Sequence, residues 1–86
     1  MDIDGLKATI RAGNSAAEAG AKTLARVASE VADAAELARR TIHDSRNENA
    51  QTALNRLVEV EREVERTLRR FDAAIQHADA YLRVIG

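Results

Sequence analysis

The chain contains no cysteine, proline or tryptophan, and it has only four glycines. Without cysteine, neither a disulfide framework nor a thiolate metal site can form. Without proline, and with so little glycine, few residues would interrupt a helix. Aromatic residues make up only 2% of the chain, which leaves little for nucleic-acid bases to stack on. The absences therefore favour helical structure and argue against nucleic-acid binding.

An excess of charge of one sign is also lacking. Thirteen basic residues and fourteen acidic residues give a net charge of −1, which offers no electrostatic attraction to nucleic acid or an anionic membrane. No apolar run approaches the ~18 residues of a membrane-spanning helix, and no segment resembles a cleavable signal peptide. We therefore expect a protein that is cytoplasmic, or exported without a cleavable signal peptide.

What is present is a helix-forming composition. The 86 residues are 45% hydrophobic, mostly Ala, Val, Leu and Ile, with abundant Glu and Arg. This length and composition predict a single all-α domain spanning residues 1–86.

A polar run at residues 43–49 divides the chain into two arms. These seven consecutive residues carry no apolar side chain, and Asp, Ser and Asn favour caps and turns. Within the run, Ser45 and Glu48 have the spacing of a capping box. We therefore predict an antiparallel helical hairpin with long helices at about 3–43 and 46–85. The alternative is one unbroken helix, roughly 120 Å long.

The first arm has an uninterrupted heptad pattern. Asp2 can cap its start, and two columns of residues repeat every seven positions. One column holds Ile3, Ile10, Ala17, Leu24, Val31 and Ala38, and the other holds Leu6, Gly13, Gly20, Val27, Ala34 and Thr41. Gly13-Asn14-Ser15, followed by Glu18, could instead mark a break. Because the heptad phase continues through it, we expect one continuous helix.

The second arm shows the same pattern with larger side chains. Its columns are Leu54, Glu61, Leu68, Ile75 and Leu82, with Ala50, Leu57, Val64, Phe71, Ala78 and Ile85. Charged residues at spacings of three and four occupy the opposite face, as on a solvated helix surface.

Folding the arms about residue 46 places residue i near residue 92 − i. Phe71 then faces Gly20, and Ile75 faces Ala17, so large side chains meet small ones as a packed interface requires. The predicted seam between the helices comprises Ile10, Gly13, Ala17, Gly20, Leu24, Val27, Val31, Leu57, Glu61, Val64, Leu68, Phe71, Ile75 and Leu82, and the predicted turn residues are Ser45 and Glu48.

Glu61 is an acid within a core column, opposite Val31. Such a residue can fix the register or the oligomeric state at a cost in stability. Alternatively, it lies at the edge of the seam and extends its carboxylate to water.

Residues for catalysis or ligand binding are not evident. A di-iron bundle needs inward-facing Glu-x-x-His motifs, but neither His43 nor His77 follows a glutamate by three residues. A narrow bundle of small side chains also offers no pocket for a nucleophile and its base. The cluster Arg62, Arg66, Arg69 and Arg70 is interleaved with glutamates that cancel most of its field. We therefore predict no enzyme activity and no catalytic, cofactor-binding or metal-binding residues.

Apolar residues remain beside the seam in both arms. They are Ala21, Ala28, Ala35 and Ile42 in the first arm, and Val60, Ala74 and Tyr81 in the second. A lone hairpin would leave them exposed to water, and apolar patches of this size mark interaction surfaces. Dimerisation into a four-helix bundle is the simplest way to cover them.

The small size, the two long helices and the central polar turn resemble the WXG100 (ESAT-6-like) proteins of actinobacteria and firmicutes. They also resemble uncharacterised small helical-hairpin proteins of actinobacteria. The resemblance covers the whole chain and lies in architecture. The Trp-x-Gly motif of the family is absent, because the turn reads Ser45-Arg46-Asn47. Of the family's C-terminal export pattern only the tyrosine is present, since Ile85 follows Tyr81 where an acid is expected.

The resemblance implies a hairpin that forms a homodimer, or a heterodimer with a related or larger helical protein. The leading hypothesis is therefore a non-enzymatic protein-interaction module, in its sharper form an escort or adaptor for a secreted or toxin protein. The alternative is a self-assembling structural or regulatory coiled coil with no client.

Overall fold

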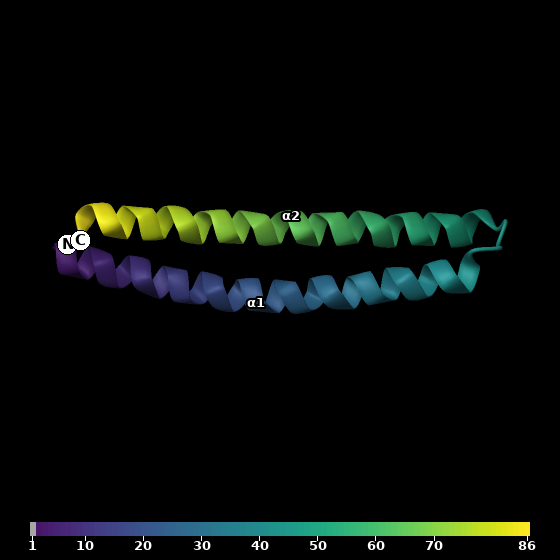
Figure 1. Ribbon diagram of the computed structural model, residues 1–86, viewed down its shortest axis with the longest axis horizontal. Coiled ribbons are helices and arrows are strands. Elements are labelled where there is room, and N and C mark those ends of the chain that lie inside the picture. Colours follow the sequence, from purple (N-terminus) through teal and green to yellow (C-terminus); the bar gives the residue numbers. More distant parts are fainter. Residues whose placement is uncertain (1) are drawn as a thin grey trace.

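The molecule is a hairpin of two long helices. A computed structural model describes residues 2–86 and contains α1 (Ile3–Ile42) and α2 (Glu48–Ile85). The helices lie side by side and antiparallel, with both termini at one end and the turn at the other (Figure 1). The molecule measures 63 × 17 × 15 Å, which excludes an unbroken helix of about 120 Å. The predicted hairpin is confirmed.

The start of α1 follows the sequence prediction. Asp2 has an extended backbone, and its Oδ1 accepts a hydrogen bond of 2.6 Å from the Gly5 amide. The carboxylate of Asp4 in the first turn complements the positive end of the helix dipole. The helix then continues through residues 13–15 without interruption, so the expected continuous helix is confirmed and a break there is excluded.

The turn is built differently from the predicted capping box. The N-cap of α2 is Asn47, whose Oδ1 accepts hydrogen bonds from the amides of Asn49 (2.8 Å) and Ala50 (3.3 Å). Ser45 lies before the helix, and its Oγ accepts from the Asn47 amide at 3.2 Å. The helices therefore end at residue 42 and begin at residue 48, rather than at 43 and 46 as predicted.

The loop of residues 43–47 explains this difference. The five residues between the helices are at the long end of the usual range of about two to five, and the two amide hydrogen bonds to Asn47 Oδ1 place the start of α2 at Glu48. Residues 2–86 include no non-glycine residue with positive φ, so this turn needs no glycine. The absence of glycine and proline from the turn is thereby explained.

The seam between the helices contains both heptad columns of α2. Every position in these columns is at least partly buried, from Ala50 to Ile85. On α1 the column from Ile10 to Ala38 is also partly buried. These three columns lie in the seam as their spacing predicts.

In the fourth predicted column, the second one on α1, the buried positions are partly shifted by one residue from those predicted. Leu6, Gly20 and Val27 are partly buried as predicted, but Gly13, Ala34 and Thr41 are exposed, whereas the residues that follow these three are partly or fully buried. The full column that replaces them is Lys7, Asn14, Ala21, Ala28, Ala35 and Ile42. Four of these six residues were expected to flank the seam, and that expectation is wrong.

The size of the facing side chains gives a physical reason for this register. By the 92 − i rule, Ala35 is level with Leu57 and Ala28 is level with Val64. Turning the alanine column toward α2 allows the helix axes to approach while the larger side chains fill the space between them. Two observed contacts, Asn14 with Asp79 and Gly20 with Phe71, follow the rule to within one residue.

The hairpin has almost no enclosed core. Ala35 is the one fully buried residue within residues 2–86. The radius of gyration is 19.1 Å, compared with about 12 Å for a compact domain of this length. Nearly every apolar side chain therefore keeps one side toward solvent.

Candidate protein-interaction surface

The predicted seam residues lie along one line of contact between the helices, with one exception. All except Gly13 are partly buried, and none of them is fully enclosed. Gly13 is exposed, and a Cβ placed on it would meet no atom within 4 Å.

At Gly20, near the middle of α1, the side chain of Phe71 from α2 packs against the backbone. The ring of Phe71 lies over it, with Cε1 only 3.0 Å from the position that a Cβ on Gly20 would occupy. The glycine therefore makes room for the largest apolar side chain of α2, as the sequence pattern indicates.

The two sides of the hairpin differ in chemistry. On the side that we call the polar face, Asn14 Nδ2 donates a 2.8 Å hydrogen bond to Asp79 Oδ1, and Lys7 lies beside Gly86. Helical periodicity extends this face to exposed charged residues on both helices. They are Arg11, Glu18 and Arg39 on α1, with Glu65, Asp72 and Asp79 on α2.

The opposite side, which we call the apolar face, carries no charge along its centre. It begins at the Gly20–Phe71 contact and continues at the heptad spacing along both helices. Its residues are Gly13, Gly20, Val27, Ala34 and Leu37 on α1, with Ala53, Val60, Thr67, Ala74 and Tyr81 on α2. Because the α1 alanine column is buried in the seam, the surplus apolar residues of both helices meet on this single face.

Large side chains on the apolar face are left in water. Leu37 is 63% exposed, Tyr81 is 48% exposed and Val60 is 43% exposed. The sequence analysis missed Leu37, although its position three residues after Ala34 places it on the same helical face. Because these exposed apolar side chains gather on one face, that face is the candidate interaction surface of the hairpin.

A shallow hollow interrupts the apolar face in the half nearer the termini. It is lined by Ala17, Thr67, Arg70, Phe71 and Ala74, so it crosses from α1 to α2. Small residues on either side of the Phe71 ring create this depression, which an apolar side chain from a partner would fit.

Glu61 lies in the seam and is partly buried. Within residues 2–86, every buried side-chain polar atom has a hydrogen-bond partner. Since no hydrogen bond or ion pair is formed by the Glu61 carboxylate among these residues, it reaches solvent at the edge of the seam. This favours the interpretation of Glu61 as an edge residue over a role in fixing register.

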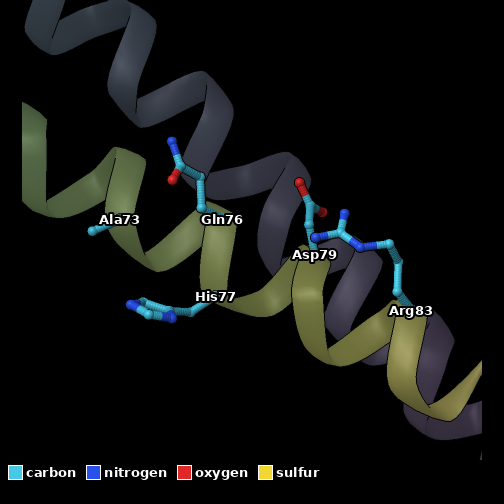
Figure 2. Close-up of a pocket in the computed structure, with 5 residues that line it drawn as sticks. All are labelled: Ala73, Gln76, His77, Asp79 and Arg83. Carbon is cyan, nitrogen blue, oxygen red and sulfur yellow. The ribbon is translucent and has the colours of Figure 1, made fainter.

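A further depression on the molecule is an open trough on α2. Ala73, Gln76, His77, Asp79 and Arg83 line it, and His77 points away from the Asp79 and Arg83 side chains (Figure 2). Because all five residues belong to one helix, nothing closes the trough into a site that excludes water. In the described part of the chain, no cluster of three or more His, Asp or Glu side chains is arranged to hold a metal ion.

Neither helix, over the residues described, has a segment both long and apolar enough to cross a lipid bilayer. Comparisons with protein-family models, with curated proteins and with solved structures found no match to the chain. Functional inference therefore depends on the two faces of the hairpin.

Proposed function

We propose that the protein is a non-enzymatic interaction module that binds helical protein partners through its apolar face. The observation that carries this proposal is the combination of a single fully buried residue with exposed Leu37, Val60 and Tyr81 on one face. A hairpin of this kind gains most of its burial of apolar surface only when another chain covers that face.

The shape of the face favours a helical partner. Two parallel ridges of side chains, with a hollow crossing the seam between them, form the groove that receives the apolar side of an amphipathic helix. One or two further helices would complete a bundle around the seam.

In its sharper form, the proposal is a WXG100-like escort or adaptor for a secreted or toxin protein. The supporting features are the short chain, the two helices of nearly equal length and the compact polar turn. The partner would then be a related or larger helical chain. The second candidate is a self-assembling structural or regulatory coiled coil, which the same apolar face would also support.

Capture of partners from native lysate separates these two functions. The tagged wild-type protein is compared with Ala34→Lys, which places a charge on the apolar face, and with Ala25→Lys. Both alanines are exposed positions of α1, and Ala25 lies toward the polar face. An adaptor retains one larger protein in stoichiometric amount with the wild type and with Ala25→Lys, and loses it with Ala34→Lys.

Two results would count against the proposal. Capture that is unaffected by Ala34→Lys would show that the apolar face is not the binding surface. A protein that captures nothing and remains a stable helical monomer would exclude both functions.

A further inference from the structure

We propose that the occupant of the apolar face is a second copy of this chain, arranged so that the turn of each copy lies over the termini of the other. This inference rests on the proposed function and gives it a partner and an orientation. The two hairpins would stack face to face about a twofold axis perpendicular to their length, at the level of Ala25 and Thr67. Each helix would then pack on its own counterpart in the other copy.

The first support is the area that such a dimer would bury. One hairpin exposes 6425 Å². A folded protein of twice its 9.4 kDa mass exposes about 8,300 Å² by the usual scaling of surface with mass. Two hairpins would have to bury about 4,500 Å² together to reach that value, which lies within the range of about 2,000–5,000 Å² found for obligate dimers.

The second support is the placement of a hollow and a protruding side chain on the apolar face. The hollow is lined by residues from Thr67, at the axis, to Ala74, seven residues toward the termini. Exposed Val60 lies seven residues to the turn side. In the proposed orientation Val60 of each copy is therefore level with the Ala74 end of the hollow in the other copy. With both turns at the same end, each hollow would face the Gly20 and Ala74 region of the other copy, leaving a void.

The same relation holds along α1. Leu37 lies twelve residues to the turn side of Ala25, and Gly13 lies twelve residues to its termini side. Leu37 of each copy is therefore level with Gly13 of the other, where the hairpin has open space. A large side chain thus meets a small one along the α1 contact, as close packing between two helices requires.

Charged residues of α2 at the edge of the apolar face support the same orientation. Glu63 lies four residues to the turn side of Thr67 and Arg70 lies three residues to its termini side, and both are exposed. In the proposed dimer each Glu63 therefore lies within one residue of the level of Arg70 of the other copy, on the side of α2 that borders the apolar face. Pairs at an exposed rim add little affinity, but they help to select an orientation.

Spin labels at the turn test this proposal directly. Because the chain contains no cysteine, Arg46→Cys provides one label per copy, and any measured distance is between copies. With the turns at opposite ends of a bundle 63 Å long, we expect the labels to be separated by about that length. Turns at the same end would place the labels only about 20–30 Å apart, given helix spacings of 8–10 Å.

A disulfide test checks the position of the twofold axis. Thr67 lies next to that axis, so the Thr67→Cys variant should oxidise readily to a covalent dimer. Thr52→Cys is the matched control, since Thr52 is exposed on the outer surface of α2 and should form few cross-links.

The outcomes separate this inference from the proposed function. A short distance between turn labels would overturn the orientation, as would equal cross-linking of the two cysteine variants. The wild-type protein could instead be a monomer when alone and bind another helical chain, with that binding lost in Ala34→Lys. This result would show that the apolar face is not occupied by a second copy of the chain. That last result would leave the proposed function standing.

Discussion

At the scale of single residues, the contact between Gly20 and Phe71 decides how closely the helices approach. A methyl group at position 20 would come within 3.0 Å of the ring, so the ring would have to move. Alanine in place of glycine favours a helix by about 0.5–1 kcal/mol, whereas overpacking costs about 1–3 kcal/mol. We expect the steric cost to outweigh the gain in helix propensity, because the ring packs directly against the α1 backbone at Gly20.

We therefore expect Gly20→Ala to lower the melting temperature, and Gly20→Leu to lower it further. In a Phe71→Ala background the steric cost is removed, and Gly20→Ala should then raise stability by about 0.5–1 kcal/mol. Thermal melts at fixed protein concentration measure the four variants of the cycle. If Gly20→Ala changed the melting temperature in the same direction in the wild-type and the Phe71→Ala backgrounds, the ring would not be what restricts position 20. Ala19→Gly, at an exposed neighbouring position, provides the effect of helix propensity alone.

The turn offers a second test at this scale. Asn47 caps α2 with two hydrogen bonds, whereas the Ser45 hydroxyl accepts only one, from within the loop. Replacing Asn47 with Ala should cost about 1 kcal/mol, within the usual range for a lost N-cap. Ser45→Ala should cost less. Urea unfolding of the two variants compares them, and a larger loss for Ser45→Ala would favour the capping box predicted from the sequence.

At the scale of the helices, most of the architecture could be predicted from the spacing of apolar residues. Both seam columns of α2 follow their heptads because large and small side chains contrast clearly with the charged residues around them. The one-residue difference in α1 could not be predicted in the same way. Positions such as Ala34 and Ala35 carry the same side chain, so hydrophobicity does not distinguish which of them faces α2.

The N-cap of the second helix and the partners of charged side chains were also hard to predict from the sequence. Ser45 and Asn47 are both good N-caps, and their nearly equal preferences do not choose between them. Among the many charged residues at spacings of three and four, the ion pairs that form include Arg26–Glu30 and Arg56–Glu59. Long exposed side chains have several partners of nearly equal energy, so sequence spacing does not select among them.

The register of α1 can be tested with a matched pair of substitutions. Ala35 is fully buried, so Ala35→Leu must separate the helices and should cost about 1–3 kcal/mol. Ala34→Leu adds the same side chain at an exposed position and should leave the fold of the hairpin intact. Far-ultraviolet circular dichroism during urea unfolding measures both. A greater loss for Ala34→Leu than for Ala35→Leu would place Ala34 in the seam, and the assigned register would then be wrong.

At the scale of the whole molecule, the hairpin is too thin to bury its own apolar residues. It exposes 6425 Å², whereas a compact protein of its mass exposes about 5,000 Å². The sequence indicates that apolar surface remains, but it does not indicate that this surface lies on one side. That result depends on the rotation of α1, which buries its alanine column and leaves Leu37 exposed beside Val60 on the same face.

The most direct test of this account is the mass of the protein in solution, measured by light scattering coupled to gel filtration at micromolar concentration. We expect the wild type and Ala25→Lys to have about twice the 9.4 kDa chain mass. Ala34→Lys should shift toward the monomer, because it places a charge within the apolar face. A wild-type protein that is a single, stably helical species of 9.4 kDa would contradict the proposed dimer.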